Sequence, residues 1–417
     1  MKLITGLSYS AAMAASVGLL GLYIKMTLPP PASERLYDRE IVKKLALTGG
    51  LVKDGNELAP LINVHAIVTG ATSGLGREIA SELYGLGATV ILASRSAKKT
   101  DDVARTILQE YPDSQGTLVS EKTVDTSSLD SVKDFADWYT TKFGETLHVL
   151  VNNAGIHYAS LKPSPLIHHD MDTRSVDGYD SAFATNYLGH FLLTRLLTPS
   201  LLKTEERGGI GGRVVNVASS YHLQSDGTML YSHNGEMPEA ARPDVHTAKH
   251  RGRSYANNKL AQVLHAKEMQ RRIFSQGAGL GVGLRVFSSC PAWASTNILP
   301  DNAGGNFVSS MAFRPKVAIL GVLGAILDTK KFKGGEFVAV FKNRIMHQWW
   351  ARPLMKLATQ LGVRDTLTNT LAMFILADQN RHYGYWSENS SAEGDDEELA
   401  RNLYDWSTRA TDKWAST

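Results

Sequence analysis

The glycine-rich stretch 69–76 constrains the fold of this 417-residue chain more strongly than any other feature. A short run of apolar and β-branched residues at 64–68 precedes it, as expected of a buried parallel strand, and a helical pattern follows over 77–86. Glycines between a strand and a helix permit a tight turn and a close approach of the backbone to a pyrophosphate, which faces the helix N-terminus. An ordinary glycine loop is the alternative, but this context favours an α/β fold that binds a dinucleotide.

A second predicted strand, 89–93, indicates which dinucleotide is bound. It ends close to Arg95, with Lys98 and Lys99 just beyond, and no Asp or Glu occupies 92–100. NAD sites usually place an acidic residue here for the ribose 2′-hydroxyl, whereas an arginine suits a 2′-phosphate. A solvated basic loop is the alternative, but the pattern favours NADP(H) over NAD. The residues expected to bind the cofactor here are Thr69, Gly70, Ser73, Gly74, Leu75, Gly76 and Arg95.

Four further strand patterns complete the predicted sheet. The third is weak and precedes Asp125, which we expect at the adenine edge, and the fourth, 147–151, leads into the Asn-Asn-Ala-Gly sequence 152–155. A fifth apolar strand is closed by Ser219, and a sixth covers 284–287. Strands that alternate with helical segments predict a doubly wound, parallel Rossmann sheet in a single α/β domain.

Tyr255 and Lys259 carry the candidate chemistry. Residues four apart on a helix share one face, so the phenol and the ammonium address the same small volume. A nearby cation favours the phenolate and is expected to lower the phenol's pKa from its ordinary value of about 10. A phenol with a pKa of about 7 suits general acid–base catalysis of carbonyl reduction or alcohol oxidation. The pair alone also occurs by chance in many helices, so its weight depends on the motifs before it.

These motifs together resemble the short-chain dehydrogenase/reductase family over roughly 63–300. The resemblance is specific because several motifs occur in the family's order: the stretch 69–76, the sequence 152–155, Asn186, Ser219, and Tyr255 with Lys259. The finer pattern in 177–180, 186–194 and 213–220 is similar to the membrane-bound, retinol-dehydrogenase-like branch of the family.

The resemblance implies roles for individual residues. The family's catalytic residues fall on Asn186, Ser219, Tyr255 and Lys259. Its cofactor contacts fall on Asn152, Ala154, Gly155, Tyr255, Lys259, Pro291 and Thr296. Many relatives have Pro-Gly where this chain has Pro291 and Ala292, which leaves the geometry of that turn open. No metal site is predicted.

Physical arguments support the implied roles. Ser219 would lie at the carboxyl edge of the sheet, where open α/β folds bind ligands, and could polarise a substrate carbonyl there; Ser220 is the competing choice. Asn186 lies in a helix rich in apolar residues, so it either holds a proton-relay water near Lys259 or is a buried core amide. Lys259 is expected to lower the pKa of Tyr255 and to bond the nicotinamide ribose. Cys290 is interpreted as a packing residue.

The N-terminal segment 3–24 contains no charged side chain and is long enough, at about 33 Å as a helix, to cross a bilayer. A cleaved signal peptide and a buried core helix are the alternatives to an uncleaved membrane anchor. The apolar stretch continues past the small residues 12–15, which favours the anchor. Positive charge downstream favours a catalytic domain facing the cytosol. The expected location is the endoplasmic reticulum or a lipid droplet.

Two segments are longer than the family minimum. Residues 224–251 are polar and are expected either to cover the mouth of the active site or to form a disordered surface loop. The segment 309–362 contains an eleven-residue apolar run, 317–327, and an apolar and basic stretch, 341–361, with Trp349 and Trp350. That segment either lies in a membrane interface or buries against the core and the substrate cavity.

The predicted organisation therefore has five parts. They are a membrane anchor and linker (1–30), an N-terminal extension (31–62), a Rossmann core (63–308), an insertion that caps the substrate or meets the membrane (309–362), and a last core helix, last strand and amphipathic tail (363–417). A formal net charge of +3 is too small to argue for nucleic acid as a partner. A homodimer is a candidate assembly.

The predicted function is an NADP(H)-dependent oxidoreductase acting on a lipophilic carbonyl or alcohol of the retinoid, sterol or fatty-aldehyde type. A membrane-surface scaffold or sensor that binds the cofactor with little turnover is the alternative.

Overall fold

The computed structural model describes residues 39–48, 59–144, 146–161, 173–206, 211–243, 248–275, 283–291, 294, 296, 314–328, 331–341, 383–388 and 393–416. The predicted anchor at 3–24, Trp349 and Trp350, and the stretch 342–361 lie outside these residues. No helix within the described ranges is long and apolar enough to span a membrane.

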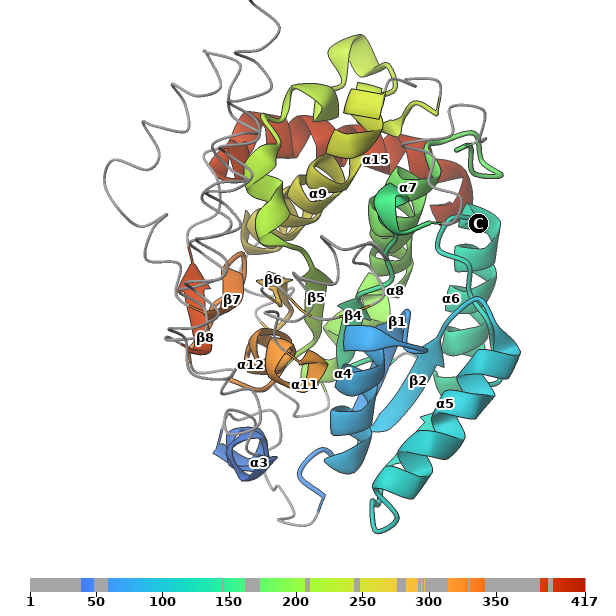
Figure 1. Cartoon of the computed structure of the whole chain (residues 1–417), viewed down its shortest axis with the longest axis vertical. Coiled ribbons are helices and arrows are strands. Elements are labelled where there is room, and N and C mark those ends of the chain that lie inside the picture. The colour runs from blue at the N-terminus through green and yellow to red at the C-terminus, as the bar shows by residue number, and fades with distance from the viewer. Residues whose placement is uncertain are drawn as a thin grey trace, which may run out of the picture.

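An eight-stranded sheet with the order β3-β2-β1-β4-β5-β6-β7-β8 forms the centre of the molecule (Figure 1). Its strands are β1 His65–Thr69, β2 Thr89–Ala93, β3 Thr117–Val119, β4 Val149–Asn152, β5 Arg213–Val217, β6 Arg285–Cys290, β7 Phe337–Phe341 and β8 Tyr383–Glu388. Each neighbouring pair from β3 to β7 is parallel, and β8 runs antiparallel to β7. The predicted parallel Rossmann sheet is confirmed, although β5 ends two residues before Ser219.

Helices cover both faces of the sheet because alternate side chains of each strand point to opposite sides. In β1, Ile67 packs into one apolar core, whereas Ala66 and Val68 pack into the other. The first core also contains side chains of α6 Leu129–Phe143, α8 Gly189–Glu206, α9 Ala248–Ser275 and α15 Glu397–Ala415. The second contains side chains of α3 Arg39–Thr48, α4 Gly74–Gly85, α5 Ala97–Glu110 and α12 Leu320–Leu327.

The predicted Rossmann core ends at position 308, but in the structure the core continues beyond it. Strand β7 lies inside the predicted insertion 309–362 and pairs with β6, so this segment completes the sheet. After the short helix α11 Pro315–Ala318, every residue of α12 from Gly321 to Leu327 is buried. An apolar run too short to span a bilayer is buried on all sides when it packs against a sheet. For 317–327, the buried-core alternative is therefore correct.

The described part of the long segment 224–251 also differs from expectation. Residues 224–243 include 3₁₀ turns, and Leu230 and Ala241 are fully buried in the first core. The turn is tied to α15, because the Ser232 N–H donates to Asn402 Oδ1 at 2.7 Å and Asn402 Nδ2 donates to the Ser232 carbonyl at 2.9 Å. Residues 224–243 therefore pack into the core instead of forming a disordered surface loop, and none of them lines the cavity described below. The segment contacts both α9 and the C-terminal helix α15.

The predicted amphipathic tail is confirmed as α15. Leu399, Leu403 and Trp406 are buried on its inner face, one or two turns apart. Asp396 caps its first turn by accepting a hydrogen bond from the Leu399 N–H at 3.0 Å. In Figure 1 this helix crosses the molecule next to α9, although the two are separated by more than a hundred residues.

Candidate active site

A cavity of about 500 Å³ follows the carboxyl ends of the central strands. From β1 the chain adds β2 and β3 on one side of the sheet, and then β4 to β8 on the other side. The strand order therefore reverses between β1 and β4, which are neighbours here. Open α/β sheets bind ligands at such a point, because the loops on its two sides diverge. The cavity is lined by both the glycine-rich turn and the candidate catalytic residues.

The glycine-rich turn forms one wall of the cavity. Gly70 and Gly74 have φ values of +65° and +55°, which other residues adopt with strain. A Cβ atom on Gly76 would lie 2.4 Å from the Gly70 carbonyl oxygen and 2.4 Å from Asn153 Nδ2. Helix α4 begins at Gly74, three residues earlier than predicted, and Ser73 makes no side-chain capping bond to it. The first N–H groups of α4 therefore face the cavity, an arrangement that fits a pyrophosphate.

Thr69 and Asn152 support this wall from behind and do not line the cavity themselves. The Thr69 hydroxyl accepts hydrogen bonds from the N–H groups of Asn153 and Ala154 at 2.8 and 3.0 Å. Asn152 Nδ2 donates to the Thr194 hydroxyl and to Asn216 Oδ1, each at 2.9 Å. These bonds join β1, β4 and β5, so the two residues shape the site and the neighbouring Asn153 faces the cavity.

Arg95 lines the far end of the cavity, as predicted for a 2′-phosphate contact. Ser94, Ser96 and Lys99 line the same end, and Ser96 caps α5 by accepting the Lys99 N–H. Asp125 does not line it; its Oδ1 accepts hydrogen bonds from the N–H and the hydroxyl of Ser127 at 2.9 and 2.7 Å. The residues on either side of Asp125, Val124 and Thr126, line the cavity instead.

Ser219, Tyr255 and Lys259 meet at the opposite end of the cavity. Burial raises the pKa of Tyr255, and a hydrogen bond with the Ser219 side chain offsets only part of this rise. Two further rings pack against Tyr255: His157 with its ring centroid 4.8 Å away and Tyr221 at 5.7 Å. The hydroxyls of Ser219 and Tyr255 therefore share one position where a substrate oxygen can be held.

The ionisation of Tyr255 and Lys259 differs from the prediction. Burial lowers the pKa of Lys259 to about 7, and the phenol's pKa is raised rather than lowered. The ammonium lies 5.3 Å from the centre of the Tyr255 ring and donates to the Val217 carbonyl at 2.6 Å and to Gln262 Oε1 at 2.9 Å. Burial is the largest cause of both shifts, so in this structure the phenol is a proton donor at neutral pH.

A family model described as short chain dehydrogenase matches residues 64–232. The chain is 33% identical to short-chain dehydrogenase TIC 32 A, chloroplastic, of Brassica napus over 252 residues, which cover 60% of this chain and 70% of that protein. The chain belongs to the short-chain dehydrogenase family.

Two further relatives support the predicted branch of this family. Polyprenol dehydrogenase of Mus musculus is 35% identical over 214 residues, covering 51% of this chain and 55% of that protein. Retinol dehydrogenase 12 of Homo sapiens is 32% identical over 216 residues, covering 51% and 57%. The chain thus spans little more than half the length of these two relatives. The predicted resemblance to retinol-dehydrogenase-like enzymes is confirmed, as is the class of oxidoreductase that uses a nicotinamide dinucleotide.

Asn186 is not at the surface of this dehydrogenase's cavity, although the family pattern implies a catalytic role for it. Its side-chain amide accepts the Ile156 N–H at 2.7 Å and donates to the Ile156 carbonyl at 2.9 Å. These two bonds use both polar atoms of the side chain and hold the loop after β4. The residue lies in a π-helical turn, Ala184–Leu188, a distortion that often marks functional sites.

Pro291 and Thr296 line the cavity as predicted, and Thr296 also packs against the glycine-rich turn near Gly74. The Cys290 side chain is buried, and its Sγ accepts a hydrogen bond from the Ser220 N–H at 3.2 Å, in agreement with its interpretation as a packing residue. Ala292 lies outside the described residues.

Several lining residues were not predicted from the sequence. Lys99 could have been found, because it stands in the same basic run as Arg95. His157 and Tyr221 follow predicted strand ends by six and two residues, and nothing in their local sequence indicates that their rings meet at Tyr255. Burial lowers the pKa of His157 to about 4, so this ring is neutral near pH 7.

Proposed function

We propose that this short-chain dehydrogenase transfers a hydride between NADP(H) and a lipophilic carbonyl or alcohol. The observation that carries the proposal is the convergence of Ser219, Tyr255 and Lys259 in the same cavity as the glycine-rich turn. A scaffold that only binds the cofactor would not require a hydroxyl pair and a buried lysine at the end where the nicotinamide would lie.

In the direction of reduction, Ser219 holds the substrate carbonyl oxygen and Tyr255 donates a proton to it. When bound, the nicotinamide supplies the hydride. The burial that raises the pKa of Tyr255 keeps the phenol protonated, which suits a general acid. Lys259, next to the phenol ring, stabilises the phenolate formed when the proton leaves. Asn186 contributes through its main-chain position at the π-helical turn.

NADP(H) is favoured over NAD because Arg95 and Lys99 line the end of the cavity where the adenosine ribose would lie. An arginine can bind a 2′-phosphate through charge-assisted hydrogen bonds. Arg95→Asp should therefore shift the preference from NADPH toward NADH by roughly 2 to 4 kcal/mol, measured as the ratio of kcat/KM values. A wild-type enzyme that already prefers NADH would show that the assignment of Arg95 is wrong.

The substrate end of the cavity is apolar and aromatic, with Ile156, His157, Leu161 and Tyr221 among its lining residues. Such walls suit a flat or extended hydrocarbon next to the reacting carbon. Two relatives are named for retinol and polyprenol, both lipophilic alcohols. We infer a substrate of the retinoid, sterol or fatty-aldehyde type.

The decisive experiment incubates the purified protein with NADPH and a panel of lipid aldehydes and ketones, and with NADP⁺ and the corresponding alcohols. We expect consumption of NADPH at 340 nm with at least one lipid carbonyl and none with short polar carbonyls. An enzyme that binds NADPH but turns over no member of either panel would favour the scaffold alternative.

We also propose that 3–24 anchors the enzyme in a membrane with the catalytic domain in the cytosol. Twenty-two uncharged residues are long enough to cross a bilayer, and such insertion is effectively irreversible. The full-length protein should stay in the membrane pellet through an alkaline carbonate wash, and deletion of 1–30 should release it. Release of the full-length protein by the wash would contradict the anchor.

A further inference from the structure

Gln262 lies on α9 three residues after Lys259, and its side chain is almost completely buried beneath the site. Its Oε1 accepts a hydrogen bond from Lys259 Nζ at 2.9 Å. Its Nε2 donates to the main-chain carbonyl of Asn186 at 2.8 Å. Lys259 Nζ can only donate, so the Gln262 atom beside it must be the amide oxygen. The Asn186 carbonyl can only accept, so the Gln262 atom beside it must be the amide nitrogen. Together they allow one orientation of the Gln262 amide.

The Asn186 carbonyl receives a second side-chain bond. His190 Nδ1 lies 3.2 Å from it, and because a carbonyl oxygen only accepts, this ring nitrogen carries the proton. The other ring nitrogen, Nε2, lies 2.9 Å from the Thr69 hydroxyl. A carbonyl oxygen has two lone pairs, and the donors from Gln262 and His190 match them. The position where a relay water would bind Asn186 is therefore taken by protein groups.

A direct chain of polar groups thus runs from Lys259 through Gln262, Asn186 and His190 to Thr69 behind the glycine-rich turn. Every member of this chain is buried. Buried polar networks in which each member is bonded fix side-chain positions strongly. The two groups that accept hydrogen bonds from the Lys259 ammonium, Gln262 Oε1 and the Val217 carbonyl, are both neutral dipoles.

We propose that Gln262 is a positioning residue for the dehydrogenase reaction: its amide takes the place of a relay water, connects Lys259 to the π-helical turn at Asn186, and fixes the ammonium below Tyr255. Two of the three N–H bonds of the ammonium are then directed at Val217 and Gln262, and the third is left for the Tyr255 oxygen or the nicotinamide ribose. This inference rests on the proposed roles of Tyr255 and Lys259.

Three titratable groups on the surrounding elements bear on Lys259. Tyr255 lies on the same helix, Cys290 comes from β6, and His190 comes from α8. Replacing the amide of Gln262 should change the proton affinity of Lys259 while these three groups stay in place. A methionine removes the acceptor and disfavours the ammonium, whereas a glutamate places a carboxylate beside it and favours the ammonium.

The test measures NADPH affinity by fluorescence from pH 6 to pH 10, which requires no turnover. For Gln262→Met, the pH at which affinity is half lost should fall by about half a unit or more, and kcat should fall about tenfold, the worth of a hydrogen bond to a charged group. For Gln262→Glu, the midpoint should rise by about one unit or more. Gln262→Glu and Gln262→Asn provide the measurement if Gln262→Met does not fold.

Gln270→Met is the matched control. Gln270 is a second buried glutamine on α9, and it accepts the Val286 N–H at 2.7 Å and donates to the Leu284 carbonyl, away from Lys259. Its variant should lose stability but keep the wild-type midpoint and kcat. The proposal is overturned if all Gln262 variants keep the wild-type midpoint and kcat, or if Gln270→Met shifts them equally. Absence of turnover in the wild type would count against the proposed function, and the affinity measurement would still decide the role of Gln262.

Discussion

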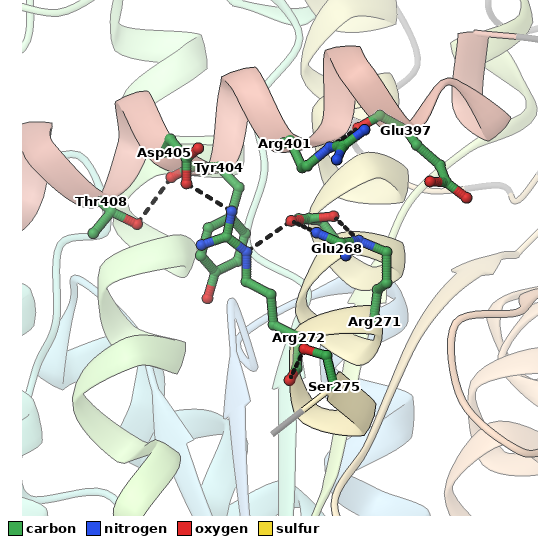
Figure 2. A network of polar contacts seen from close by, with 9 residues as sticks. All are labelled: Glu268, Arg271, Arg272, Ser275, Glu397, Arg401, Tyr404, Asp405 and Thr408. Carbon is green, nitrogen blue, oxygen red and sulfur yellow. Dashed lines mark hydrogen bonds and ion pairs between the residues drawn. The ribbon is translucent and has the colours of Figure 1, made fainter. Parts of the chain in front are cut away.

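The two ends of helix α9 hold their charged side chains in opposite ways. In its first half, Lys259 is buried among neutral carbonyl and amide groups, and its pKa is lowered to about 7. Near its end, Arg271 and Arg272 both bond the buried carboxylate of Glu268, and Arg272 also bonds Asp405 of α15 at 2.6 Å (Figure 2).

The arginines show the reverse shift in proton affinity. The hydrogen bond to Glu268 raises the pKa of Arg271. Burial acts to lower the pKa of Arg272, but its bonds to Glu268 and Asp405 outweigh burial and raise it. A charge held by opposite charges stays charged, whereas a charge held by dipoles can gain or lose its proton near neutral pH. One helix thus carries a chemical site at one end and a structural clamp at the other.

The largest expected effect is at the chemical end. Tyr255→Phe should retain NADPH binding and lose turnover by about two to four orders of magnitude, the usual worth of a general acid. The control is Tyr404→Phe, which alters a ring that stacks under Arg272 at the clamp end, 4.2 Å from its guanidinium carbon. That variant should keep its turnover. Near-normal kcat in Tyr255→Phe would contradict the proposed mechanism.

Removing the charge at the chemical end should separate function from stability. We expect Lys259→Met to lower kcat/KM by about two orders of magnitude, because both the acid and the cofactor lose a partner. Its free energy of unfolding should equal or exceed that of the wild type, since burying an ammonium without a counter-charge is unfavourable. A kcat/KM assay and urea titration at pH 7 measure the two quantities. Marked destabilisation of the variant would show that Lys259 is a structural residue.

Glu268→Gln probes the clamp end. The variant leaves two arginines without their shared carboxylate, and we expect a loss of about 1 to 3 kcal/mol in the free energy of unfolding. Turnover at a temperature where the variant is folded should be unchanged. Glu397→Gln, at the exposed start of α15, is the control and should cost much less. Equal stability of Glu268→Gln and the wild type would argue that apolar packing alone holds α15.

The last expected effect concerns pH. The pKa of Lys259 is about 7 in the folded state and about 10.5 when unfolded, so between these values the unfolded chain binds more protons. The lysine therefore destabilises the fold fully below pH 7, and this penalty disappears as pH rises toward 10.5, with a slope of at most about 1.4 kcal/mol per pH unit. The difference in unfolding free energy between wild type and Lys259→Met should shrink accordingly from pH 7 to 9.5. A constant difference would contradict the lowered pKa.

The local sequence determined the parts of this protein that depend on neighbouring residues. The glycine-rich turn, the strands before and after it, Arg95 at a strand end, and Tyr255 with Lys259 on one helical face were all predictable. In each case the physical requirement is local: a positive φ, an apolar run, or a spacing of four residues.

Only the tertiary structure decided which polar groups face the cavity and which support it. Thr69 and Asn152 bond residues 42 to 121 positions away, and Gln262 joins Lys259 to a carbonyl 76 positions earlier. The place of β7 in the sheet likewise depends on its pairing with β6 across a long connection. Hydrogen bonds and burial between distant segments leave no periodic signal in the chain, because each depends on where two backbones happen to meet after the sheet has formed.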